Sequence, residues 1–139
     1  MQDEKRTFID TNILVYCVYG TSDQKEIIGE ILSDRKIIAI LSTQVLKEFT
    51  NVSIKKKLHK TLPELKRHLS IIQQSFIIFE INTYTIFDAL DIKESHKYSF
   101  YDSLIIASAI ESKCATIYSE DMHHGQIIKK QLKISNPFI

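Results

Sequence analysis

The chain has 139 residues, 44% of them hydrophobic, and a formal net charge of +1. This length favours a single domain over residues 1–139, and the hydrophobic content is too high for a disordered chain. No apolar run approaches the roughly 20 residues of a membrane helix, and the charged N-terminus lacks the apolar segment of a signal peptide, so we expect a cytoplasmic protein with no membrane partner.

Strands and helices are expected to alternate along the chain. Apolar runs predict five strands, at about 7–10, 37–41, 76–81, 115–119 and 132–135. Helical spacing and capping residues predict six helices, at about 12–19, 23–33, 43–58, 61–74, 83–96 and 99–113. Thr11 or Asn12 is expected to cap the first helix and Thr83 the fifth. Such alternation is typical of an α/β fold with helices on both faces of a mostly parallel sheet.

Asp10 stands at the end of the first predicted strand, where the chain turns into a helix. In parallel α/β sheets, ligands bind beyond the carboxyl ends of the strands. A carboxylate there is a candidate site residue. An N-cap or Asx-turn residue would occupy the same position, so the strand end alone does not decide between the two interpretations.

Two more carboxylates lie near the apolar faces of predicted helices. At about 100° per residue, Glu48 falls about 60° from Val45, at the edge of an apolar stripe. Asp102 is in line with Ile105 on its own helix. Each has a structural alternative. Glu48 could be a rim residue that reaches water or pairs with Lys47 or a more distant lysine, and Asp102 could complete a capping box with Ser99.

Asp121 follows the fourth predicted strand and is the last candidate, with an ordinary loop acid as the alternative and Glu120 as a competitor. Four carboxylates gathered together would repel one another, and a divalent cation removes that conflict. Oxygen ligands select Mg²⁺ or Mn²⁺, and such a site suits phosphodiester hydrolysis. The sequence contains no glycine-rich phosphate loop and no G-x-S-x-G elbow.

Positive charge is concentrated in the middle of the chain. Residues 47–67 hold seven Lys/Arg against two Glu. A basic face of this kind is a possible phosphate-binding surface, and the alternative is a solvated helical surface.

Several stretches together resemble a PIN domain, specifically the VapC-type toxin ribonucleases of toxin–antitoxin pairs. They are FIDTNILVY at 8–16, STQVLKEF at 42–49, SFYDSLIIASA at 99–109, YSEDM at 118–122 with the His-Gly pair at 124–125, and NPF at 136–138. Each stretch is weak evidence alone, but they occur in order at about the family's spacing. The resemblance covers nearly the full length.

The resemblance implies a PIN-like three-layer α/β/α fold around a central, mostly parallel five-stranded sheet. It also implies a Mg²⁺- or Mn²⁺-dependent endoribonuclease that cleaves RNA, forms a homodimer and is inhibited by a cognate antitoxin. Asn12 matches the polar residue that orients the first acid, and Ser119 matches a small hydroxyl position near the last acid. The four acids that the resemblance implies as catalytic metal ligands are Asp10, Glu48, Asp102 and Asp121. The residues expected to contact RNA phosphates are Lys55, Lys56, Lys57, Lys60 and Arg67.

Two other functions remain open at this level. The first is a catalytically silent PIN-like module that binds RNA or protein, against which the complete acid set argues. The second is a phosphotransfer enzyme of the haloacid-dehalogenase type, because Asp10-Thr11-Asn12 partly matches its D-x-D start. Asn12 in place of the second Asp counts against it.

Overall fold

The computed structural model describes residues 4–139. Residues 1–3, part of the charged segment behind the expectation of no signal peptide, lie outside this range. Within the described part of the chain, the helices are all too short or too polar to cross a membrane.

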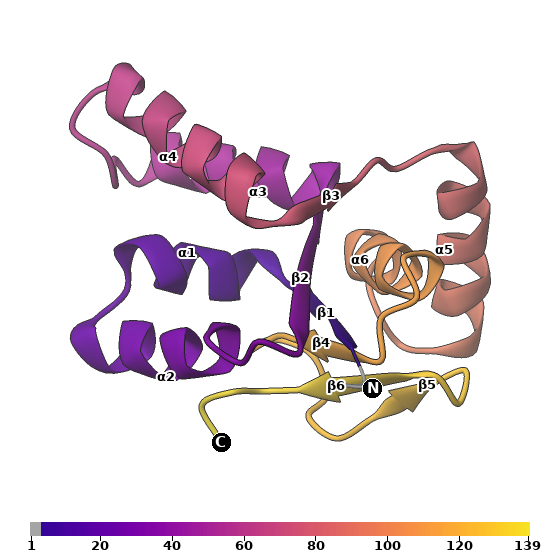
Figure 1. Ribbon diagram of the computed structural model, residues 1–139. Helices are drawn as coiled ribbons and strands as arrows, with labels where there is room; N and C mark the ends of the chain where they lie inside the picture. The colour runs from indigo at the N-terminus through magenta and orange to yellow at the C-terminus, as the bar shows by residue number, and fades with distance from the viewer. Residues whose placement is uncertain (1–3) are drawn as a thin grey trace.

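A six-stranded sheet forms the centre of the fold, with the order β3-β2-β1-β4-β6-β5 (Figure 1). Its strands are β1 (Lys5–Ile9), β2 (Ile37–Ser42), β3 (Ile77–Phe79), β4 (Thr116–Tyr118), β5 (Ile127–Ile128) and β6 (Leu132–Ser135). All neighbours pair in parallel except β5 and β6, which are antiparallel. The predicted α/β class is confirmed, but the count of five strands was wrong. The missed strand β5 has two residues, too few to show a periodic pattern.

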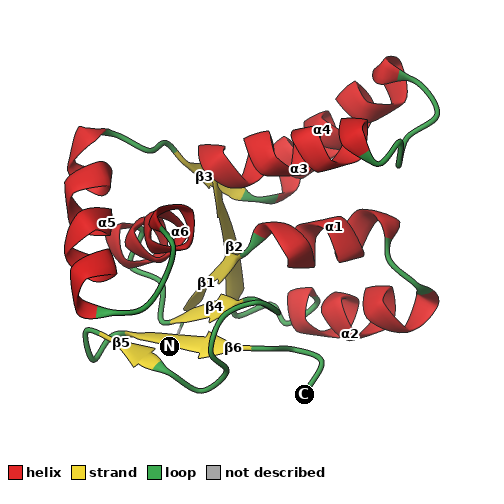
Figure 2. Cartoon of the chain, turned by 180° about the vertical axis from the view of Figure 1, so that it is seen from behind, coloured by secondary structure: helices red, strands yellow, loops and turns green. Residues whose placement is uncertain are grey.

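Residues 4–139 form six helices, as predicted, and α1 and α2 lie on one side of the sheet while α5 and α6 lie on the other (Figure 2). Their bounds are α1 (Thr11–Tyr19), α2 (Ser22–Leu32), α3 (Thr43–Lys55), α4 (Leu62–Ser75), α5 (Thr83–Ser95) and α6 (Phe100–Glu111). Helix α3 ends three residues before the predicted position 58. Lys56 is its C-cap, and Lys57 adopts a left-handed φ of 53°, which a continuing helix does not allow.

The N-caps of α1 and α5 differ from the residues first expected. Asp10 caps α1 in place of Thr11 or Asn12, as its alternative interpretation predicted, and Asn82, not Thr83, caps α5. In both cases the carbonyl or carboxylate oxygen of a short side chain accepts hydrogen bonds from the free amides of the first turn. The cap of α1 is therefore also the candidate site residue.

The hydrophobic core restrains the elements that carry the candidate site residues. Strand β1 is flanked by β2 and β4, and Phe8 and Ile9 at its carboxyl end are fully or almost fully buried. Helix α6 is buried over its whole middle, from Ser103 to Ala109. Because β1 and α6 are both packed from all sides, the residues that follow or precede them have little freedom to move.

Candidate functional site

A pocket of about 270 Å³ lies where β1 runs into α1. All four predicted acids line it. They come from four separate segments: Asp10 caps α1, Glu48 lies on α3, Asp102 lies in the first turn of α6, and Asp121 follows β4. We call this the acidic pocket. Its other lining residues are Thr11, Asn12, Val15, Tyr16, Val52 and Lys56.

Asp10 is the most deeply buried acid of the pocket, with 6% of its surface exposed. One carboxylate oxygen, Oδ1, accepts from the Thr11 amide at 2.7 Å, and Oδ2 accepts from the Ser119 hydroxyl, also at 2.7 Å. The pKa of Asp10 is raised from 3.8 to about 6, mainly because of burial; these hydrogen bonds lower the pKa, and the charges of Asp102 and Glu48 add to the rise. Asp10 is thus both a helix cap and a pocket acid whose burial disfavours its charged form.

Glu48 and Asp102 are half-buried, and each has a raised pKa. Burial is the main cause for both. The Gln44 amide donates to Glu48 Oε1 at 2.8 Å and opposes the shift at Glu48, whereas the charge of Asp102 adds to it. The charge of Asp121 likewise raises the pKa of Asp102. The acids therefore affect one another's protonation, as closely placed carboxylates do.

The structural alternatives for Glu48 and Asp102 are at most partly met. The Ser99 hydroxyl accepts from the Asp102 amide at 3.1 Å, so Ser99 is the N-cap, but among residues 4–139 no hydrogen bond from the Ser99 amide to the Asp102 carboxylate completes a capping box. This cap does not take Asp102 away from the pocket. Glu48 forms no ion pair with a lysine among the described residues.

Asn12 and Ser119 contact different acids from those that the resemblance implied. The Asn12 side chain donates to Asp121 Oδ2 at 2.9 Å and accepts from the Glu120 amide at 3.3 Å, so it holds the last acid rather than the first. Ser119 contacts Asp10, not Asp121. The exchange arises because β1 and β4 are neighbours, which places each polar side chain beside the acid of the other segment.

Glu120, the competitor of Asp121, does not line the acidic pocket. Its carboxylate accepts from the Tyr16 hydroxyl at 2.6 Å. This hydrogen bond is the main reason why the pKa of Tyr16 is raised to about 12. The sequence did not identify Tyr16, which contacts Glu120, or Gln44, which contacts Glu48. For Gln44, its position four residues before Glu48 on the same helix was an available signal.

The oxygen-only donor set fits a hard divalent cation such as Mg²⁺ or Mn²⁺. Lys56 is the sole basic residue among the pocket's described lining, and no ion pair to a pocket acid occurs within residues 4–139. As the side chains lie, no three His, Cys, Asp or Glu in that range are close enough together to hold one ion. Like-charged carboxylates favour such a spread, and Asp121, which accepts from Asn12, is the exposed member of the four.

The basic residues expected to contact RNA are all exposed, but they do not form one cluster at the acidic pocket. Lys56 lines that pocket. Lys60 and Arg67 line a separate depression at the start of α4, together with Glu64. Lys55 and Lys57 line neither.

A larger groove of about 660 Å³ lies between α3 and α4. It has no carboxylate or histidine in its described lining, which is mainly apolar and amide or hydroxyl groups with two lysines. The larger of these two pockets is therefore not the one lined by acidic side chains. The smaller acidic pocket is the one that holds convergent ionisable groups with perturbed pKa values.

The comparisons with known proteins point the same way as the pocket. The family model described as "PIN domain" matches residues 7–129. Among curated proteins, no sequence matches significantly.

Three similar solved structures have sequence identities of only 14–17%, so they show a shared fold. A toxin–antitoxin complex from Klebsiella pneumoniae has a TM-score of 0.70 at 15% identity, covering 94% of this chain and 97% of that one. VapC20 of Mycobacterium tuberculosis, described as a Sarcin-Ricin loop cleaving toxin, has a TM-score of 0.66 at 14% identity. The match covers 83% of this chain and 89% of that one. VapBC2 of Rickettsia felis, bound to a DNA fragment from its promoter, has a TM-score of 0.66 at 17% identity. The match covers 94% of this chain and 98% of that one.

Proposed function

Because the chain belongs to the PIN-domain family, we propose that it is a metal-dependent endoribonuclease and acts as the toxin of a toxin–antitoxin pair. The observation that carries this proposal is the gathering of Asp10, Glu48, Asp102 and Asp121 from four distant segments in one pocket. Burial without a paired cation is unfavourable for carboxylates. Asp10 is buried there and Glu48 and Asp102 are half-buried, which favours a functional over a stabilising role.

The same four acids would hold Mg²⁺ or Mn²⁺. When bound, such an ion supplies Lewis-acid activation of a phosphoryl group and of water. The chain's own groups prepare the site. Ser119 and the Thr11 amide fix both oxygens of Asp10, and Asn12 fixes Asp121. Fixed orientation of this kind is what neighbouring polar groups contribute to metal ligands.

RNA is the proposed substrate, and exposed basic residues would contact its phosphates. Lys56 is placed to meet the backbone at the acidic pocket, because it lines the pocket without pairing to an acid among residues 4–139. Lys55, Lys57, Lys60 and Arg67 would contact phosphates farther along the strand. Such contacts position RNA but do not read its sequence.

We further propose a cognate antitoxin protein, a homodimer and a cytoplasmic location, with residues 1–139 acting as a single PIN domain. The structural neighbours from Klebsiella pneumoniae and Rickettsia felis, which are described as toxin–antitoxin assemblies, support the antitoxin partner. Co-purification with the product of an adjacent short reading frame would test this part.

The catalytic proposal is tested by cleavage of a structured RNA with Mn²⁺ or with EDTA, by wild type and by Asp10→Asn. Wild type with Mn²⁺ should cleave, and the other combinations should not. A matched control is Asp34→Asn, which alters an exposed acid far from the pocket and should cleave like wild type. Equal cleavage in every combination would contradict the proposal.

One observation favours a second candidate, a catalytically silent PIN-like module that binds RNA or protein. The pocket acids lie too far apart, as placed, for three side chains in residues 4–139 to hold an ion. Calorimetric titration with Mn²⁺ separates the two functions. The silent module would bind RNA tightly and show no Mn²⁺ binding that depends on Asp10.

A further inference from the structure

Gln44 occupies an unusual position for an amide side chain. It lies in the first turn of α3, directly after the N-cap and first helical residue, yet only 8% of its surface is exposed. Glutamine is mostly found at the surface. Its side-chain nitrogen donates to two acceptors: Glu48 Oε1 at 2.8 Å and the Tyr101 carbonyl at 3.1 Å. Both amide hydrogens are thereby used.

The amide oxygen of Gln44 is buried and has no hydrogen-bond partner. An unpartnered buried acceptor destabilises a fold, and an apolar side chain of similar length would avoid that loss. A 180° flip of the amide would not give its oxygen a hydrogen-bond donor, because the oxygen would then face two other oxygens, those of Glu48 and Tyr101. The side chain is therefore held in one orientation that stability alone does not explain.

The two acceptors belong to different parts of the acidic pocket. Glu48 is one of its acids, and Tyr101 directly precedes Asp102, another of them. The charges of Glu48 and Asp102 oppose each other. A glutamate has three side-chain torsions and is free to swing away from a like charge toward water. The Gln44 amide, which donates to the Glu48 carboxyl group at 2.8 Å, opposes this movement.

We propose that Gln44 is a positioning residue, whose amide holds the Glu48 carboxyl group at the acidic pocket and ties α3 to the start of α6. This inference rests on the proposed metal-dependent function and adds a member to its site. Gln44 itself does not line the pocket, so it acts through Glu48.

The test is Gln44→Met, which keeps the length of the side chain and removes both donors. Mn²⁺ affinity, measured by calorimetry on metal-free protein, should weaken by about tenfold, the usual effect of losing a group that orients a metal ligand. The Mn²⁺ concentration for half-maximal RNA cleavage should rise by a similar factor. The urea midpoint should stay unchanged or rise, because the unpartnered oxygen is gone. Gln74→Met, at an exposed position of α4, is the matched control and should match wild type in all three measurements.

A merely structural role for Gln44 predicts the reverse pattern: a lower urea midpoint with unchanged Mn²⁺ affinity. That result would overturn the inference. If Gln44→Met does not fold, Gln44→Asn replaces it, since its amide is one methylene too short to reach Glu48 and should show the same loss of Mn²⁺ affinity. A wild-type protein that neither binds Mn²⁺ nor cleaves RNA overturns the proposed function and the role of Gln44 with it. A wild type that does both, with Gln44→Met equal to it, overturns only the role of Gln44.

Discussion

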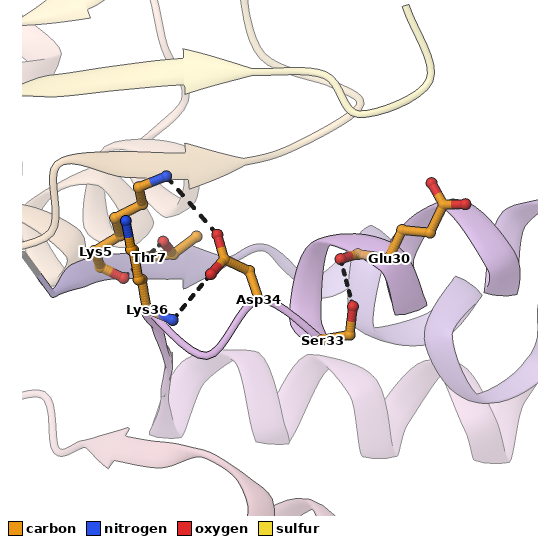
Figure 3. A network of polar contacts seen from close by, with 6 residues as sticks. All are labelled: Lys5, Thr7, Glu30, Ser33, Asp34 and Lys36. Atoms are coloured by element: carbon orange, nitrogen blue, oxygen red, sulfur yellow. Dashed lines mark hydrogen bonds and ion pairs between the residues drawn. The ribbon is translucent and has the colours of Figure 1, made fainter. Parts of the chain in front are cut away.

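The two ends of the sheet place an aspartate in opposite environments. At the end where β2 begins, Asp34 accepts from the Lys36 amide at 2.9 Å and pairs with Lys5 at 3.8 Å, while 41% of its side chain is exposed (Figure 3). The turn is tightened further by the Ser33 hydroxyl, which donates to the Glu30 carbonyl at 2.8 Å. At the opposite end, Asp10 is buried, near other carboxylates and without a paired lysine or arginine among residues 4–139.

This difference favours a structural role for Asp34 and a functional role for Asp10. Asp34 has a hydrogen bond, a counter-ion and water, so it suits its turn. Asp10 is ionised at neutral pH at the expense of the fold: a pKa near 6 in place of 3.8 corresponds to about 3 kcal/mol of lost stability. A residue kept under such a penalty is a candidate for chemistry. The following five experiments test this contrast.

The largest effect is expected for Asp10→Asn on RNA cleavage. The variant removes one charge from the proposed ion site but keeps the shape of the side chain. Its cleavage rate should fall by about a thousandfold, as losing a preorganised group that stabilises charge does in other enzymes. Asp34→Asn should retain wild-type rates. A rate for Asp10→Asn within a factor of three of wild type would remove Asp10 from the mechanism.

The pH dependence of stability is the next largest effect. Between pH 3.8 and about 6, the folded state keeps a proton on Asp10 that the unfolded state has lost, so lowering the pH through this window favours folding. Wild type should therefore gain up to about 3 kcal/mol relative to Asp10→Asn between pH 7 and pH 4. Urea unfolding at a series of pH values measures this difference. Parallel curves for the two proteins would contradict the raised pKa.

Stabilisation by Mn²⁺ should be slightly smaller. An ion that binds only the folded state at 100 times its dissociation constant stabilises by about 2.7 kcal/mol. Thermal or urea unfolding with and without Mn²⁺ should show this shift for wild type and for Asp34→Asn. Asp10→Asn should show little of it. A shift of equal size in Asp10→Asn would place the ion elsewhere in the protein.

Ser119→Ala should have a moderate effect. The fully buried Ser119 hydroxyl donates to Asp10 Oδ2, and a hydrogen bond to a charged group contributes about 1.5–3 kcal/mol. At pH 7 we expect a loss near the lower end of that range, because the pKa of Asp10 rises further and part of the penalty is relieved by protonation. Ser108→Ala, equally buried but bonded to a backbone carbonyl, is the control and should not change the pH profile.

The smallest effect is expected for Asp34→Asn on stability. The asparagine still accepts from the Lys36 amide and loses only the ion pair with Lys5. Exposed ion pairs contribute about 0–1 kcal/mol, and salt screens them. The urea midpoint should therefore change little, and the change should shrink at high ionic strength. A loss larger than that of Ser119→Ala would reverse the contrast between the two ends of the sheet.

Three acids of the pocket were accessible from the sequence because each stands at a position with a simple geometric meaning. Asp10 ends a strand, Glu48 lies at the edge of a helical stripe, and Asp102 is in line with a buried helix face. These local rules place side chains relative to their own element. The family resemblance was needed for Asp121, which is a loop residue with no periodic pattern around it.

What the sequence could not provide was contact between elements. Ser119 donates to Asp10, and Asn12 donates to Asp121, because β1 pairs with β4. No local sequence pattern encodes this pairing. Glu120 and Asp121 are adjacent in sequence, and their environments differ because Tyr16 donates to the Glu120 carboxylate whereas Asn12 donates to that of Asp121. The two-residue strand β5 was missed for a different reason, its shortness.

The sheet order has a consequence for synthesis on the ribosome. Strand β1 is made early, but its partner β4 and the hydroxyl of Ser119, 109 residues after Asp10, emerge much later. A nascent chain that has not reached β4 has a central strand with one open edge and an acid lacking its orienting neighbour. The acidic pocket is therefore assembled only after β4 has been made, so a ribosome that stalls earlier releases a fragment unable to form it.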